Sequence, residues 1–520
     1  MRKKEAEAYL TVYVALSLTA LLSLFLVLLE GVRYNTIQAE AEIITDIAAD
    51  SILAEYHREM LKQFGMFWVD TSYGTAQPSM EMVEQHMQGY LEKNCDSDVF
   101  LFSLPLYRDL LKMEPLDLCV EKAAVATDEG GRVFRQRAAE VVKDEIGLSF
   151  LEKIIEWLKI IEDNGLQGRD LEQEMQSVGE EIEALSGEEK QVGEEWVTVE
   201  IENPLKALEG QQRKGLLRQV LEDPDKVSSR TINLDTLVSS RWKREEINSG
   251  NWTLEEESLI DRLLWQEYLM RYCGHYGAES EEDLLQYQVE YLIAGKNSDT
   301  ENLKSVTYRI CAVRWAAAVM YLFTDETKCA AAEAVATAAT TLLTVPEAAS
   351  LVKFAILLGW AYAEGIYDVR CLFAGQKVPL LKSDDTWHYD LDGLLDSILK
   401  GIFDEDTTEK NAEGIDTGEQ EGGGQNTGEQ NARARDSEEQ DSEEQEQEGL
   451  TYQDYLRILL ALSSLEEQTF RMMDIVEMDI RQTPGNENFR IDGCIDRLEA
   501  EVTIQSAYGY TVTIHKKKKY

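Results

Sequence analysis

The sequence predicts a mainly helical protein. It would have an N-terminal transmembrane helix that continues into a stalk, an extracytoplasmic helical body, a disordered acidic linker and a small C-terminal module of a helix plus a β-hairpin. Three observations lead to this prediction. Residues 9–29 form an uncharged apolar run, helical periodicity recurs through most of the chain, and residues 404–448 lack the apolar side chains that a core needs. A chain of 520 residues is long enough for several domains.

The apolar run at residues 9–29 contains no charge, proline or glycine. As an α-helix it would be about 31 Å long, which matches the hydrocarbon thickness of a bilayer. It ends without the small-residue cleavage pattern of a secretory signal, so we expect it to remain as an anchor in contact with membrane lipid. Residues 2–4 are basic, whereas Arg33 is the only basic residue soon after the run. The positive-inside rule therefore predicts a cytoplasmic tail at residues 1–8 and a cell-membrane protein whose bulk is extracytoplasmic.

The helix is expected to continue past the membrane as a stalk at residues 30–64. No helix breaker occurs between Val32 and Phe64, and Gly65 provides a C-terminal stop. Apolar residues recur at steps of three or four along the stalk: Ile37, Ala41, Ile44, Ala48 and Ile52. This narrow stripe would pack either on the body of the same chain or on a partner helix.

Amphipathic helix patterns divide the body into a first helical region at residues 65–245 and a second helical core region at 246–403. An alanine-rich stretch within the second region is apolar enough to suggest another membrane span. Pro346, Glu347 and Lys353 interrupt it, so we expect buried core helices instead.

The C-terminal module is predicted at residues 449–520. Residues 452–480 have the apolar face of a helix, and residues 501–514 alternate with the period of strands. The hairpin is expected to turn near Tyr508 and Gly509. The lysine-rich end after it would be solvated, and contact with an anionic wall polymer or lipid is the alternative.

The linker at residues 404–448 holds seventeen acidic and three basic residues and no aromatic one. Ile415 is its only aliphatic residue larger than alanine. Burial could not offset the loss of chain entropy on folding, so the sequence predicts a disordered spacer, with loose calcium binding as the alternative.

The formal net charge of −47 excludes nucleic acid as a plausible partner, because such a surface repels phosphates. The seven cysteines are scattered and form no CxxC pair, which argues against a zinc site and a disulfide framework but leaves one or two bridges open.

Motifs of known chemistry are absent from the sequence. The five histidines form no HExxH pattern, and no GxSxG elbow occurs. Cys273 and His275 place a thiol near an imidazole, but a catalytic pair needs a spatial geometry that the sequence does not supply. We therefore expect no enzyme activity, no catalytic or metal-binding residues, no cofactor and no small-molecule substrate.

The N-terminal region resembles the tight-adherence (Tad) pilus proteins of the TadE/TadG type. The resemblance rests on the apolar helix closed by residues 30–33, which read EGVR, and on the alanine-rich helix after it. It implies assembly contacts at the two edges of the span, with Glu5 and Glu7 at the inner edge and Glu30 and Arg33 at the outer edge. The chain departs from processed pilins in having no glycine before the apolar run.

The whole chain is also similar to a domain-of-unknown-function family of Gram-positive bacteria. The matching stretches are residues 53–56, 287–296, 361–370, 377–380, 452–455 and 472–474. Together the two resemblances imply a non-enzymatic membrane-anchored component of a Tad or type IV-like pilus or secretion apparatus, either a minor pilin-like subunit or an assembly protein. A surface adhesin or envelope scaffold unrelated to pili is the alternative, and an extracellular enzyme with an unrecognised site is a third reading.

Overall fold

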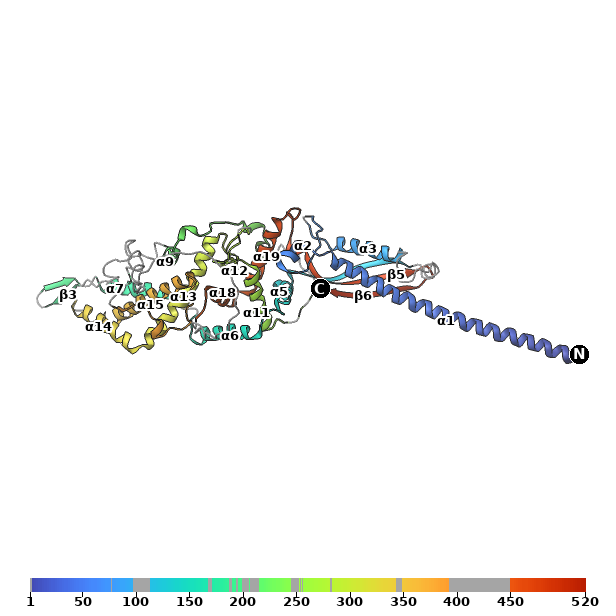
Figure 1. Ribbon diagram of the computed structural model, residues 1–520, viewed down its shortest axis with the longest axis horizontal. Helices are drawn as coiled ribbons and strands as arrows, with labels where there is room; N and C mark the ends of the chain where they lie inside the picture. Colours follow the sequence, from blue (N-terminus) through green and yellow to red (C-terminus); the bar gives the residue numbers. More distant parts are fainter. Residues whose placement is uncertain are drawn as a thin grey trace, which may run out of the picture. The chain divides into compact units, whose positions relative to one another are not determined.

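The computed structural model describes residues 2–75, 77–96, 113–166, 171–186, 189–192, 195–198, 205, 215–244, 252, 254, 256–280, 283–342, 348–391 and 449–520 (Figure 1). The predicted linker at 404–448 lies outside these residues. The chain forms two compact units, each assembled from separate stretches of sequence. Unit 1 comprises Met1–Leu148, Arg230–Asn297 and Ser463–Tyr520, and unit 2 comprises Ser149–Ser229 and Ser298–Leu462. The predicted mainly helical class is confirmed.

Unit 1 is organised around one long helix, α1 (Arg2–Ala54), drawn in dark blue in Figure 1. Its apolar first half is long enough to span a membrane, and no part of the most apolar stretch is buried in the protein. The second half carries the predicted stripe, and its five residues are at most 2% exposed. The stripe therefore packs on the body of the same chain.

The second half of α1 packs on a four-stranded antiparallel sheet. Its strands are β1 (Val69–Asp70), β2 (Met113–Val125), β5 (Cys494–Ser506) and β6 (Thr511–Lys519). The central strand is β5, which pairs with β2, with β6 and, at its beginning, with β1. The predicted C-terminal hairpin is confirmed as β5 and β6. β6 continues to Lys519, so the lysine-rich end is part of the strand and not a solvated tail, as Lys516 and Lys518 pair with Asp46.

The sequence did not indicate β2. Register shifts interrupt its pairing with β5 at three places, so its side chains do not alternate regularly between the two faces. The period-two signal of a strand is correspondingly weak.

One face of the sheet forms the core of this region together with α1 and α3 (Met80–Asp96). Leu498, Ala500, Val502 and Ile504 alternate along β5 and are fully buried. Figure 1 shows α3 and the second half of α1 running along the strands. The residues on the opposite face are more polar and more exposed.

The sequence suggested that the stalk helix runs unbroken to Phe64, but it does not. It ends at Ala54, and a short helix α2 (Arg58–Phe64) follows. The imidazole of His57 caps α2 by accepting the N–H of Met60 at 3.3 Å. The stop at Gly65 is confirmed: the glycine has φ 69° and donates its N–H to the carbonyl of Leu61 at 3.0 Å.

The predicted helix at residues 452–480 is in fact two helices. α18 (Tyr452–Leu462) belongs to unit 2, and α19 (Leu465–Arg481) belongs to unit 1. Ser464 separates them because its hydroxyl accepts the N–H of Glu467 at 3.4 Å and caps α19. Among the described residues, unit 1 also contains the helices α5 (Asp128–Val142), α10 (Val238–Lys243), α11 (Leu259–Tyr272) and α12 (Gln288–Ala294).

Unit 2 packs around α13 (Asp299–Thr324), α14 (Glu326–Leu342) and α15 (Ala349–Phe373). By length and composition α13 and α15 could also cross a membrane, but 67% of the most apolar stretch of each is buried inside the protein. The other elements are α6 (Leu148–Asp163), α7 (Leu171–Leu185), α9 (Leu216–Val220) and a small hairpin of β3 (Glu189–Val192) and β4 (Glu195–Thr198).

Candidate functional site

Unit 2 buries a cluster of charged side chains between α13, α15 and the segment after α15. The ammonium of Lys382 lies 2.6 Å from Oε1 of Glu364 and 2.7 Å from Oδ1 of Asp368, and it donates to the carbonyl of Thr386 at 3.0 Å. The three charged side chains are at most 3% exposed. Glu364 and Asp368 are four residues apart on α15, which places both carboxylates on one face of the helix.

Arg314 of α13 forms an ion pair with Asp368, the second carboxylate of this cluster. Its Nη2 lies 2.7 Å and its Nε 2.9 Å from Oδ2 of Asp368. Its Nη1 donates to the carbonyl oxygens of Pro379 and Leu380 and to the hydroxyl of Tyr455. Burial alone lowers the pKa of Arg314, but Tyr455 and Asp368 outweigh this effect, and the pKa is raised. The two carboxylates and two cations sum to zero formal charge.

His388 lies at the exposed edge of the same cluster. Its Nδ1 is 3.2 Å from Oε1 of Glu364, and its own backbone N–H and that of Tyr389 donate to Glu364. The ring of Tyr367 stacks beside the imidazole at 4.1 Å. A carboxylate that orients an imidazole occurs in acid–base catalysis. Here Glu364 is already engaged by Lys382 and two backbone donors, so its first role is to hold this segment in place.

Glu364, Asp368 and His388 place one ligand atom each within 4.8 Å of one another, close enough to share a metal ion. The ammonium of Lys382 already bridges the two carboxylates and supplies the positive charge that a metal would supply. A cation could enter only by displacing this side chain. The cluster is therefore complete as a structural ion network.

Unit 1 contains a second buried network, built on α19. Asp474 accepts the backbone N–H of Ser239 at 2.9 Å and the hydroxyl of Tyr291 at 2.6 Å. Burial raises the pKa of Asp474 to about 7. One turn further along α19, Glu477 is paired with the guanidinium of Arg241, which joins α10 to the same helix.

The two networks lie partly in the stretches that carry the family resemblance. Glu364 and Asp368 fall in residues 361–370, and Asp474 falls in 472–474. Their partners Tyr291 and Tyr455 fall in two further stretches. The sequence signal for these residues was a charged side chain inside an apolar helical run, but the partners come from distant segments and could not be assigned without the fold.

A second group that could hold a cation lies on the exposed face of the sheet. His515 of β6 has Nδ1 3.5 Å from Glu121 of β2 and Nε2 3.3 Å from Glu501 of β5. Two carboxylates and an imidazole suit zinc. The same arrangement is also complete without a metal when the imidazole is protonated between the carboxylates.

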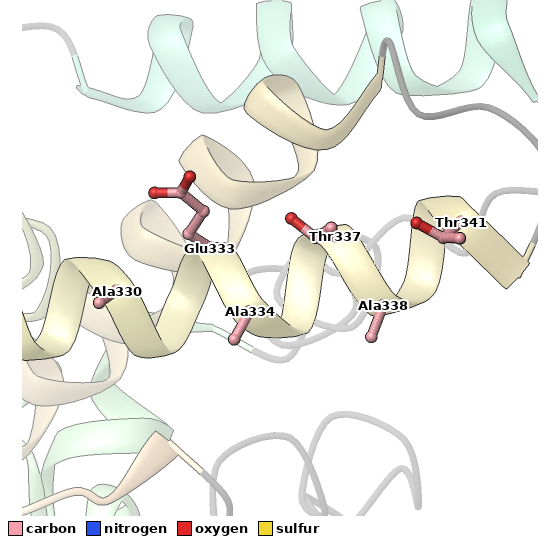
Figure 2. A pocket seen from close by; sticks show the side chains of 6 residues that line it. All are labelled: Ala330, Glu333, Ala334, Thr337, Ala338 and Thr341. Atoms are coloured by element: carbon pink, nitrogen blue, oxygen red, sulfur yellow. The ribbon is translucent and has the colours of Figure 1, made fainter.

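A shallow open hollow runs along α14, and Figure 2 shows the side chains that line it. They are Ala330, Glu333, Ala334, Thr337, Ala338 and Thr341. Glu333 is paired with Lys353 at 2.9 Å, so its charge is already matched. The hollow otherwise offers small side chains with little to orient a ligand.

The thiol and imidazole near each other in the sequence do not form a pair. Cys273 is buried against Met472, with 3.3 Å between the sulfur atoms, and burial raises the pKa of its thiol well above the usual value. The Nδ1 of His275 lies 2.9 Å from the carbonyl of Tyr276 instead. All seven cysteines are free thiols, so neither of the bridges that the sequence left open is formed.

The two predicted contact residues that follow the apolar run, Glu30 and Arg33, pair with each other and with the tip of the β5–β6 hairpin, residues 507–510. Arg33 lies 2.8 Å from Glu30, and its guanidinium lies 4.3 Å from the centre of the Tyr508 ring. The hydroxyl of Tyr510 donates to Glu30, and the rings of Tyr34 and Tyr510 meet edge to face at 5.6 Å. Both residues therefore have a role within the chain.

Glu5 and Glu7, which precede the apolar run, lie in the first turns of α1. Within the span, the hydroxyls of Ser17, Thr19 and Ser23 each donate to a carbonyl three residues earlier in the helix. These hydroxyls are therefore satisfied without water, as a membrane environment requires.

Taken together, these features define a mainly helical protein with one unburied apolar helix, a sheet built on the continuation of that helix, and buried ion networks in both units. The chain belongs to DUF5702, a family of unknown function, which it matches over residues 194–420 and 426–506. The expected similarity to a family of unknown function is thereby confirmed. No curated protein and no solved structure matches the chain.

Proposed function

We propose that the chain is a non-enzymatic, membrane-anchored component of a Tad or type IV-like pilus or secretion apparatus, as a minor pilin-like or assembly protein. The observation that carries the proposal is the course of α1. The helix is apolar and unburied in its first half. In its second half it buries one stripe of side chains against a sheet, and no break separates the two halves. A force or rotation on the membrane helix is therefore passed directly to unit 1.

The proposed orientation has the N-terminus in the cytoplasm and the body outside the cell membrane. The three basic residues at positions 2–4 support it, since basic residues are retained on the cytoplasmic side. Protease added to intact, wall-stripped cells is expected to degrade everything beyond about Val32 and to leave the anchor. A body that stays protected until the cells are lysed would overturn the orientation.

The anchor helix offers one face suited to another helix. Ala15, Thr19 and Ser23 follow one another at steps of four, which places three small side chains on one face. Small residues allow helix backbones to approach closely in a membrane, where bulk hydrophobicity does not drive association. Leu21 lies two residues after Thr19, about 200° around the helix, and belongs to the bulky face.

A cross-linking experiment tests this partner. A benzophenone amino acid replaces Thr19 in one variant of the full-length protein and Leu21 in the matched control, in cells that make the pilus. We expect the probe at position 19 to capture a second membrane helix of a pilin-like subunit and the probe at position 21 to capture lipid. Lipid adducts alone at both positions would favour the envelope-scaffold alternative.

Glu5, Glu7, Glu30 and Arg33 remain the predicted assembly contacts at the two edges of the span. The enzyme alternative has one observation in its favour, the Glu364–His388 pair. The scaffold alternative requires only the anchor and the packed units.

A further inference from the structure

The tip of the β5–β6 hairpin contacts α1 immediately after the apolar span. Every contact of the tip described above is made with residues 30–34, and the apolar run ends at Leu29. Tip and helix belong to the same compact unit. The tip therefore keeps a fixed height relative to the end of the span.

The height of the tip follows from the geometry of a continuous helix. Residues 30–34 extend from about 1.5 to 8 Å past Leu29 along the helix axis, and tilting the helix only reduces this distance from the membrane. The headgroup layer on each side of the hydrocarbon is about 5–8 Å thick. The apolar run is about as long as the hydrocarbon layer is thick, so the helix cannot move far in either direction along the membrane normal. The tip consequently lies at the depth of the headgroups.

The side chains of the tip suit that depth. Tyr508 is 42% exposed and Tyr34 is 43% exposed, although both are large aromatic residues. Tyrosine is enriched at membrane surfaces because its ring favours the apolar side and its hydroxyl the wet side. Gly509, with φ 82°, allows a tight turn that brings Tyr508 and Tyr510 to the end of the hairpin.

We infer that the hairpin tip, with Tyr508 at its centre, is inserted into the phospholipid headgroup layer as a second membrane contact beside α1. The inference rests on the proposed anchoring of the chain by residues 9–29. Two contacts fix the tilt of the sheet against the membrane, where a single helix would leave it free to rock. From the tip, β6 runs away from the membrane along α1, and Lys518 reaches Asp50 at 2.8 Å.

Photo-cross-linking of the full-length protein in phosphatidylcholine–phosphatidylglycerol vesicles tests the inference. Three variants each carry p-benzoylphenylalanine at one position, in place of Tyr508, Tyr13 or Lys519. Tyr13 lies inside the span and reports the anchor. Lys519 is exposed on the same hairpin as Tyr508 but is about 30 Å further along β6. Each variant is first checked for a melting temperature equal to that of the natural chain.

We expect phospholipid adducts by mass spectrometry at positions 508 and 13 and none above background at 519. An adduct at 13 but not at 508 would overturn the inference and leave the anchor standing. A missing adduct at 13 would overturn the anchor itself and the proposed function with it. Equal amounts of lipid adduct at positions 508 and 519 would also contradict insertion of the tip into the headgroup layer. So would capture of protein instead of lipid at position 508.

Discussion

The two units differ in how they stabilise particular buried carboxylates, although unit 1 also contains paired ones such as Glu477 with Arg241. In unit 2, Glu364 and Asp368 face the cations of Lys382 and Arg314. In unit 1, Asp474 receives only neutral donors, from Ser239 and Tyr291. Cations beside a buried carboxylate compensate its charge, whereas burial without a cation raises the pKa, as it does for Asp474. The first network should therefore be sensitive to the loss of a cation and the second to pH.

Both networks join segments that are distant in the chain. An ion cluster that is buried and fully paired is a weak source of net stability, because removing the charges from water costs about as much as their attraction returns. Its value lies in joining particular segments, here α13, α15, α18 and the segment after α15. The network around Asp474 likewise joins α10, α12 and α19.

The largest effect is expected from Lys382→Met. The substitution leaves Glu364 without its ammonium partner in a buried site, and breaking a buried pair in this way costs about 3–5 kcal/mol. Pulse proteolysis of the detergent-solubilised full chain along a urea series measures it, with peptides of α15 and α19 reporting unit 2 and unit 1 separately. We expect the loss in unit 2.

Lys353→Met provides the matched control for this experiment. It removes a lysine from an ion pair with Glu333 in the same unit, where the glutamate is 66% exposed. The expected loss is below about 1 kcal/mol. Equal losses for the two variants would show that the buried cluster is no more important than a surface pair.

A smaller, pH-dependent effect is expected from Asp474→Asn. Its folded-state pKa of about 7 lies above the usual aspartate value, so the folded protein binds more protons between these values. This contribution to stability is complete below about pH 4 and is lost as the pH rises through 7. The stability of unit 1 should therefore fall between pH 5 and 8, and Asp474→Asn should make this decline shallower while changing stability at pH 5 by only about 1 kcal/mol.

Asp479→Asn is the companion measurement, because burial raises the pKa of Asp479 to about 7 as well. Each single variant should remove part of the slope and the double variant more than either. Burial also raises the pKa values of Glu477 and Asp496 in unit 1, so part of the slope should remain. A wild-type stability that rises from pH 5 to pH 8, or an unchanged slope in both variants, would contradict this account of the unit 1 network.

The smallest effect is expected at the surface, from Lys516→Gln combined with Lys518→Gln. These lysines lie 2.7 and 2.8 Å from Asp46 and lower the pKa of its carboxyl. The pairs contribute above the usual aspartate pKa, and their contribution is lost as the pH falls through the lowered value. Because all three side chains are partly exposed, the loss at pH 7 should stay below about 1 kcal/mol and shrink in high salt. A salt-independent loss of several kcal/mol would mean that the strand β6 itself had detached.

Local patterns in the sequence predicted much of the fold. The apolar run, the stripe along the stalk, the stop at Gly65 and the turn near Tyr508 each depend on neighbouring residues and were readable without the structure. The strand β2 was missed because its register shifts disrupt the alternation that identifies a strand. The break before α19 was missed because a capping serine interrupted an otherwise continuous apolar face.

The candidate sites were less accessible to sequence reasoning. Glu364 and Asp368 could be placed on one face of a helix by their spacing, but nothing nearby indicated that Lys382 and Arg314 would meet them. The seating of Glu30 and Arg33 against the hairpin tip joins residues about 480 positions apart in the chain.

By itself, then, the sequence determined what depends on short stretches: a helix long and apolar enough to span a membrane, a buried stripe along its continuation, and a hairpin at the C-terminus. Only the tertiary structure decided which surface covers that stripe, which cations neutralise the buried carboxylates, and that the hairpin returns to the end of the apolar run. The physical reason is that hydrophobic periodicity and turn chemistry act between near neighbours. Ion pairing, strand register and the packing of distant segments are set by the free energy of the whole folded unit.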